Sequence, residues 1–284
     1  MKQKHGALRY LLAALSMLSG ATAMASDKQS PPVALPAWQV LEYEQQAFFV
    51  TASSKIEIAA DSENPQQWRL TANSSVASSS EDVVLDLAAV DGRAIYRSRL
   101  SKGKDQRYKV YQFLPQHIVR ERRDPPADIT TPPCKWPLSS RKEIPYPKAG
   151  AGIPVTDAYA LLPLAERFLA SAGDSSELVI NTEFNFYRIR MTRGEDQSIA
   201  VNYQEAGVSG PTSGRRQTRA VAIQVSPLGK LTDKPDFSLL GLTSDVTVLF
   251  DVTTGLPLQL RGTAPRIGAT EINLKAATLR KPAA

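Results

Sequence analysis

Histidine and cysteine, the side chains that most often supply a base or a nucleophile near neutral pH, are rare in this chain. It contains two histidines, His5 and His117, and one cysteine, Cys134. A Ser–His–acid triad would need His117, but no G-x-S-x-G sequence accompanies it. A Cys134–His117 pair is conceivable, yet both residues lie at the margin of a proline-rich stretch that offers a nucleophile no rigid frame. We therefore expect His117 at the surface or at a rim, and Cys134 buried or incidental, with an intermolecular disulfide as the alternative.

Metal and nucleotide sites have no support in the sequence. A closed zinc site needs several Cys or His ligands, and one of each cannot supply it. Neither GxGxxG nor GxxxxGK[ST] occurs, and no EF-hand loop is present. We expect no metal and no cofactor.

Carboxylate pairs are the remaining candidates for catalysis. Three pairs could lie close in space: Glu81 with Asp82, Glu195 with Asp196, and Asp245 with Asp251. Each pair adjoins an expected turn or strand end, where exposed acids are common. A hydrolase with paired carboxylates therefore stays the weaker alternative, and we expect no enzymatic activity.

The first 25 residues have the composition of a secretory leader. Lys2, Lys4 and Arg9 form a basic region, an apolar run covers residues 11–18, and Ala23-Met24-Ala25 has the small-x-small form of a cleavage site. We expect cleavage after Ala25 and a soluble periplasmic protein without a transmembrane segment. An uncleaved N-terminal anchor is the alternative.

The charge balance gives little reason to expect a nucleic-acid partner. Removing the three leader cations lowers the formal net charge from +6 to +3, and this surplus is spread along the chain. The short basic runs at residues 120–123 and 215–216 are expected on solvated faces. Contact of these runs with anionic lipid headgroups or polysaccharide is a secondary hypothesis.

The clearest structural pattern is a three-stranded antiparallel meander over residues 245–276. Apolar side chains alternate in each of its strands, and Thr253-Thr254-Gly255 predicts a turn in which Gly255 takes a positive φ. Pro257, within the middle strand, requires a bulge or an unpaired edge because it has no N–H.

The rest of the mature chain is also β-like, and we expect a single β-rich domain over residues 38–281 after a flexible tether at 26–37. Residues 38–124 form the first part of the sheet, and 155–281 hold a helix and the second part. A change of phase near Phe186 predicts a bulge. Between the two parts, residues 125–154 contain eight prolines, so we expect a strap through which no strand ladder runs.

One amphipathic helix is expected after an N-cap at Thr156 or Asp157, with Gly173 just beyond its end. Pro163 should kink or restart this helix. Its apolar stripe consists of Ala158, Leu161, Leu162, Ala165, Phe168, Leu169 and Ala172. The predicted fold is mainly β: a large curved antiparallel sheet, as a half-barrel or open barrel, with the helix on its concave face.

A curved sheet closed by one helix can hold an apolar ligand or can simply be filled. The side chains that would line such a cavity are Phe184, Phe186, Val246, Val248, Phe250, Leu258 and Leu260. The alternative is that these side chains form the core under the helix.

Residues 155–279 resemble a bacterial family of exported proteins, the domain-of-unknown-function 3108 family. The resemblance lies in Thr156-Asp157-Ala158-Tyr159-Ala160-Leu161-Leu162, the strand run 178–191, Val221-Ala222-Ile223-Gln224-Val225, and the closing pattern over residues 251–274. It implies an extended antiparallel sheet curved into a half-barrel with a helix on the concave side. That architecture is similar to the lipoprotein-carrier (Lol) proteins, which hold acyl chains. The family offers no catalytic residues to carry over.

Two main hypotheses follow. The first is a periplasmic carrier or chaperone that binds a lipid, a lipoprotein acyl chain or another apolar component of the cell envelope. The second is an envelope scaffold with a filled core, whose exposed edge strands recruit a partner protein.

Overall fold

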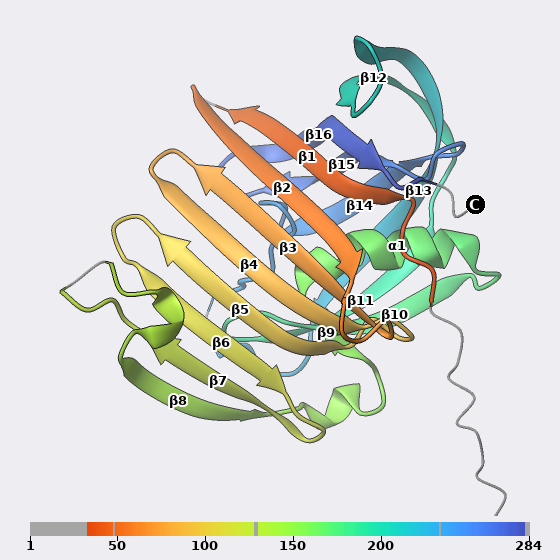
Figure 1. Cartoon of the computed structure of the whole chain (residues 1–284). Coiled ribbons are helices and arrows are strands. Elements are labelled where there is room, and N and C mark those ends of the chain that lie inside the picture. Colours follow the sequence, from red (N-terminus) through yellow and green to blue (C-terminus); the bar gives the residue numbers. More distant parts are fainter. Residues whose placement is uncertain (1–32, 48, 128–129, 233, 282–284) are drawn as a thin grey trace, which may run out of the picture. The chain divides into compact units, whose positions relative to one another are not determined.

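The computed structural model describes residues 33–47, 49–127, 130–232 and 234–281 (Figure 1). The predicted signal peptide, residues 1–25, and most of the predicted tether lie outside these residues. None of the described helices has the length and apolar content that crossing a membrane requires.

The described residues form one sheet of sixteen strands. The strands of the first half are β1 Trp38–Ala47, β2 Val50–Ala60, β3 Gln67–Val76, β4 Ser79–Ala88, β5 Ala94–Lys102, β6 Arg107–Phe113, β7 His117–Arg123 and β8 Leu138–Pro145. Those of the second half are β9 Val155–Thr156, β10 Ser175–Asn181, β11 Phe186–Arg193, β12 Gln197–Glu205, β13 Pro211–Pro227, β14 Ser244–Asp251, β15 Pro257–Ala264 and β16 Gly268–Leu279.

Antiparallel pairing of β1 with β16 joins the two halves, so the sheet runs continuously from β8 at one edge to β9 at the other. β12 pairs with both β13 and β16, which closes strands β12 to β16 into a ring. The prediction of a large curved antiparallel sheet in a mainly β protein is confirmed.

The helix lies where the sequence predicts it, inside the curve of the sheet. Asp157 caps a 3₁₀ turn, η3 Ala158–Ala160, by accepting a hydrogen bond from the backbone N–H of Tyr159, and α1 follows at Leu161–Ala170. Pro163 therefore falls in the first turn of α1, where a missing N–H is tolerated, and it starts the helix rather than kinking it. The helix ends at Ala170 with Ser171 as C-cap, so the position just beyond the cap is Ala172, one residue before the predicted Gly173.

The inner face of α1 completes a core shared by both halves of the sheet. Leu161, Leu162, Leu164, Ala165 and Phe168 are buried among apolar side chains of β1 to β4 and of β10 to β16. Figure 1 shows α1 enclosed between these two groups of strands. Burial of this stripe, rather than the intrinsic helix propensity of ten residues, stabilises so short a helix.

The predicted meander is β14, β15 and β16, each paired with the next in antiparallel register. Gly255 has a φ of +72° in the turn between β14 and β15. Pro257 is the first residue of β15 and pairs with Phe250 at a register shift, the irregular position that a residue without an N–H requires.

Three expectations about the rest of the chain need correction. The strap at 125–154 does carry a ladder: β8 pairs with β7, because residues 138–144 between Pro137 and Pro145 contain no proline. The expected bulge near Phe186 is a hairpin turn, in which Asn181 ending β10 pairs with Phe186 starting β11. Residues 33–37, assigned to the tether, belong to the body, since Val33 and Leu35 pack against the core.

Candidate functional site

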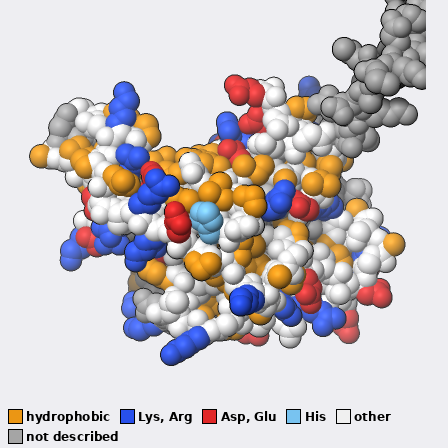
Figure 2. All heavy atoms as spheres, turned by 90° about the horizontal axis from the view of Figure 1, so that it is seen from below, with side chains coloured by type: hydrophobic (Ala, Val, Ile, Leu, Met, Phe, Trp, Pro, Cys, Tyr) orange, Lys and Arg blue, Asp and Glu red, His pale blue; other side chains and the backbone are white. Residues whose placement is uncertain are grey.

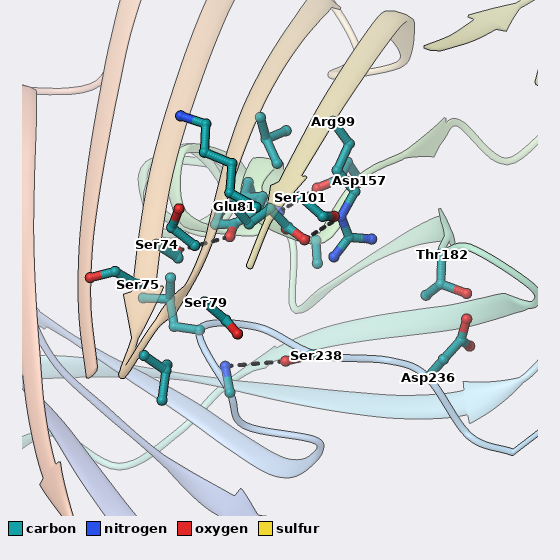
Figure 3. Close-up of a pocket in the computed structure, with 18 of the residues that line it drawn as sticks. Ser74, Ser75, Ser79, Glu81, Arg99, Ser101, Asp157, Thr182, Asp236 and Ser238 are labelled. Carbon is teal, nitrogen blue, oxygen red and sulfur yellow. Dashed lines mark hydrogen bonds and ion pairs between the residues drawn. The ribbon is translucent and has the colours of Figure 1, made fainter. Parts of the chain in front are cut away.

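A polar pocket opens beneath the tips of the β3–β4 and β5–β6 hairpins (Figure 3). Its volume is about 510 Å³. On the opposite side it is bounded by η3, the end of β10 and residues 236–241. Six of its lining side chains are serines: Ser74, Ser75, Ser79, Ser80, Ser101 and Ser238.

The pocket is polar because the inner face of the sheet changes character along β3 and β4. On β3 the inward positions run from Trp68, Leu70 and Ala72, all buried, to Ser74. On β4 they run from Leu87, Leu85 and Val83 to Glu81, which pairs with Ser74. The apolar positions share the core with α1, whereas Ser74 contacts Tyr159 of η3 through its hydroxyl group. The same alternation that builds the core therefore builds one wall of the pocket.

Arg97 of β5 lies at the base of the pocket, with only 2 % of its side chain exposed. Its Nη1 donates to Asp157 Oδ2 at 2.6 Å and to the Asn181 carbonyl at 2.7 Å. Its guanidinium lies over the ring of Tyr111, 3.7 Å from the centroid. Its Nε is buried without a hydrogen-bond partner among the described residues.

Arg99, two residues further along β5, forms the next cationic position. Its Nε donates to Glu81 Oε2 at 2.5 Å across the β4–β5 pair. Burial lowers the pKa of Arg99, but the charge and hydrogen bond of Glu81 outweigh it, so that the pKa is raised above its usual value. Arg99 is thus cationic near neutral pH. In Figure 3, Arg99, Glu81 and Asp157 lie close together, across the pocket from Asp236.

The opposite wall contributes hydroxyl and carboxylate groups. Asp236 accepts hydrogen bonds from the Phe184 N–H, Asn185 Nδ2 and Tyr187 Oη at 2.8–3.0 Å, and Figure 3 shows it beside Thr182, across the pocket from Glu81. Tyr159 Oη lies 3.1 Å from Ser74 Oγ. Burial raises the pKa of Tyr159 to about 12, so its phenol stays neutral and can both donate and accept.

The seven side chains predicted to line an apolar cavity line neither this pocket nor a smaller one of about 250 Å³ near Arg167, Phe168 and Met191. Five of them, Val246, Val248, Phe250, Leu258 and Leu260, are buried in the core. The other two lie apart from the core: Phe184 is 48 % exposed, and Phe186 packs edge-on against Tyr146. The structure therefore brings five of the seven together, as core.

The other sequence candidates are dispersed. His117 begins β7 and is half-buried, and Cys134 is exposed rather than buried. Figure 2 shows the face seen from below, on which hydrophobic and charged side chains surround a histidine. Asp245 and Asp251 lie at opposite ends of β14, where Asp251 accepts from the backbone N–H groups of Thr253 and Thr254. Within the described part of the chain, no three His, Cys, Asp or Glu side chains are placed to hold a metal ion.

Sequence reasoning missed Arg97, Arg99 and the serines. The available signal was the run of serines on either side of the β3–β4 turn, next to Glu81. Comparison with protein-family models, with curated proteins and with solved structures finds no match to this chain. The resemblance described above therefore stays a prediction.

Proposed function

We propose that this protein is a binding protein for a hydroxyl-rich ligand, a segment of carbohydrate, which it holds in the serine-lined pocket without transforming it. The predicted leader would bring it to the periplasm, where glycans of the cell envelope are within reach. The observation that carries the proposal is the lining of the pocket. Donors and acceptors surround a volume of about 510 Å³, which lies within the usual range of small-molecule sites.

Sugar hydroxyl groups both donate and accept hydrogen bonds, and the pocket offers partners of both kinds. The serine hydroxyls and the Tyr159 phenol can act in either direction, Arg99 supplies donors, and Glu81 supplies acceptors. An alkyl chain would displace water from these groups without replacing its hydrogen bonds, at about 1–3 kcal/mol for each group left unpaired. The lining therefore favours a polyhydroxylated ligand over the apolar ligand expected from the sequence.

The carboxylates of the pocket support binding rather than hydrolysis. Asp157 caps η3 and pairs with Arg97, Asp236 accepts three hydrogen bonds, and Glu81 pairs with Arg99. A glycosidase needs one carboxyl group that holds a proton for the leaving group. Each of these carboxylates is instead engaged by hydrogen-bond donors of the protein itself.

The proposal can be tested by NMR titration of the ¹⁵N-labelled mature protein with maltohexaose, hexagalacturonate and palmitate. We expect the oligosaccharides to shift amide signals of Ser74, Ser79 and Ser101. Ser101→Trp, which fills the pocket, should abolish these shifts, and Gln112→Trp on the exposed outer face of β6 should not. Shifts caused by palmitate alone, centred on Val248 and Leu258, would instead support the apolar carrier.

A scaffold role is the second candidate, and the edge strand β8 is the observation that favours it. β8 pairs with β7 on one side only, and most of its side chains are exposed. Its other side could accept a strand from a partner protein. A protein that binds none of the three titrants would favour this role.

A further inference from the structure

The basic run at residues 120–123 is split between the two faces of the sheet by its position in β7. Arg120 and Arg122 point to the inner face, as does Tyr111, whose strand partner is Arg120. Glu121 and Arg123 point to the outer face. Arg120 and Arg122 are thus brought to the same side of the sheet as the pocket.

Neighbouring strands place further cations beside them. Across the strands, Arg99 pairs with Lys109, which pairs with Arg122, while Arg120 pairs with Lys142 of β8. Arg107 lies two residues before Lys109, on the same face. We define the cationic stripe as Arg99, Arg107, Lys109, Arg120, Arg122 and Lys142.

This arrangement is unfavourable in the protein alone, because like charges directly opposite one another on adjacent strands repel. Burial lowers the pKa of Lys109, and Arg99 and Arg120 lower it further, against the opposing effect of its ion pair with Glu183. Acids offset the stripe in part: Glu81, Asp105, Glu183 and Asp124 each pair with one of its cations.

Two cations of the stripe are not offset by these acids. Among the described residues neither Arg120 nor Lys142 forms an ion pair, and Arg120 Nε is buried without a hydrogen-bond partner. The exposed members reach solvent: the side chains of Arg99, Arg107 and Arg122 are 33 %, 39 % and 36 % exposed, and Lys142 is exposed too. A ligand could therefore contact them without any rearrangement of the sheet.

We propose that the cationic stripe binds the acidic groups of an extended glycan, one end of which occupies the serine-lined pocket. This inference rests on the proposed function and gives its ligand a negative charge. Arg99 belongs to both the pocket and the stripe, so the two surfaces are continuous. From β5 to β8 the stripe crosses about 14 Å at the usual strand spacing, which exceeds a single small anion and fits a chain that carries several acidic groups.

The test compares two matched double variants by calorimetric titration with hexagalacturonate. Arg122→Gln/Lys142→Gln removes two cations of β7 and β8 from the inner face, and Arg123→Gln/Arg141→Gln removes two from the outer face of the same strands. We expect the inner-face variant to weaken binding about tenfold or more at 20 mM salt and the outer-face variant less than twofold. Raising the salt to 300 mM should weaken binding of hexagalacturonate by the unmodified protein, because salt screens exposed charges. It should also reduce the difference in affinity between the two double variants.

Maltohexaose, which has the hydroxyl groups but no charge, separates the two proposals. If it binds as tightly as hexagalacturonate, the pocket proposal stands and the stripe proposal is overturned. If hexagalacturonate binding depends on Arg122 and Lys142 but is unaffected by Ser101→Trp, the stripe binds the acidic glycan without the pocket, and both the proposed function and the placement of one glycan end in the pocket are overturned. The stripe proposal would also be overturned if the two double variants lost the same affinity for hexagalacturonate. It would be overturned as well if the stripe bound phosphatidylglycerol vesicles in place of hexagalacturonate.

Discussion

Glu166 of α1 accepts a hydrogen bond from the backbone N–H of Ala37 at 2.8 Å, 129 residues away in the sequence, and so ties the helix to the segment that leads into β1. Arg280, which directly follows β16, donates to the carbonyl groups of Pro36, Trp38 and Ile58. Burial raises the pKa of Glu166 to about 7, against the lowering effects of the Ala37 hydrogen bond and of Arg280. The contact is therefore made by a carboxyl group that titrates near neutral pH.

This contact predicts that stability falls as the pH rises from about 4.5 to about 7. The carboxyl group loses its proton near pH 4.5 in the unfolded chain but only near pH 7 in the folded one, so the folded state is favoured most at the acidic end of this window. Glu166→Gln keeps an acceptor for Ala37 without the charge. We expect it to raise the free energy of unfolding by about 1–3 kcal/mol at pH 8 relative to the unmodified protein, and by less at pH 5. Urea denaturation at the two pH values measures the difference, and an equal gain at both would contradict the assignment.

The buried pair of Arg97 and Asp157 gives a second prediction. Arg97→Leu leaves the Asp157 carboxylate and the Asn181 carbonyl without their donor, and loss of one partner from a buried pair costs about 3–5 kcal/mol. Arg97→Lys should recover little of this, because an ammonium group cannot reproduce the planar fork that contacts Asp157 and Asn181 together. Asp157→Asn, which keeps a capping side chain, should cost less than Asp157→Ala. Chemical denaturation of the four variants measures their free energies of unfolding. If Arg97→Lys were as stable as the unmodified protein, the proposed geometry would be contradicted.

Alternating side chains were sufficient to predict the meander, since β14 to β16 are antiparallel neighbours in both sequence and space. The helix was predictable for the same reason: its apolar stripe, and the cap at Asp157 on the 3₁₀ turn that leads into it, are local features. The prediction that no strand ladder runs through the strap is wrong because the prolines are unevenly spaced, and the proline-free interval between Pro137 and Pro145 is long enough for β8.

The pocket could not be predicted, because its members meet only through the tertiary fold. Arg97 and Asp157 are 60 residues apart, and Arg97 and Asn181 are 84 residues apart. In the sequence, Arg97 occupies an ordinary position of an alternating strand and gives no sign of burial. The stripe has the same origin: each strand supplies one or two cations, and only the register sets them side by side.

The packed core gives a third prediction, on two of the side chains first expected to line a cavity. Phe250 and Leu258 are 1 % and 2 % exposed within the core. Leu258→Ala should therefore lower the free energy of unfolding by about 2–5 kcal/mol, and Phe250→Ala by about 3–5 kcal/mol. Titrations with hexagalacturonate under conditions where both variants remain folded should match the unmodified protein, since neither residue lines the pocket. Small losses of stability, together with palmitate binding that depends on these residues, would indicate a cavity in place of the packed core.

The approach of Gly92 to Leu164 gives the last prediction. Gly92, in the turn between β4 and β5, has a φ of +74°, and a Cβ atom placed there would lie 2.5 Å from Leu164 Cδ2 of α1. Gly92→Ala therefore meets both backbone strain and a steric clash, and we expect a loss of roughly 2–4 kcal/mol. Gly152→Ala is the matched control: its φ is +80°, but no atom lies within 4 Å of the added Cβ, so only the strain of about 1 kcal/mol should remain. Leu164→Ala is destabilising by itself, but it removes the clash. In that background, Gly92→Ala should lower the free energy of unfolding by no more than Gly152→Ala does in the unmodified protein. Thermal unfolding of the double-mutant cycle measures the coupling, and additive losses at Gly92 and Leu164 would show that α1 does not pack against this turn.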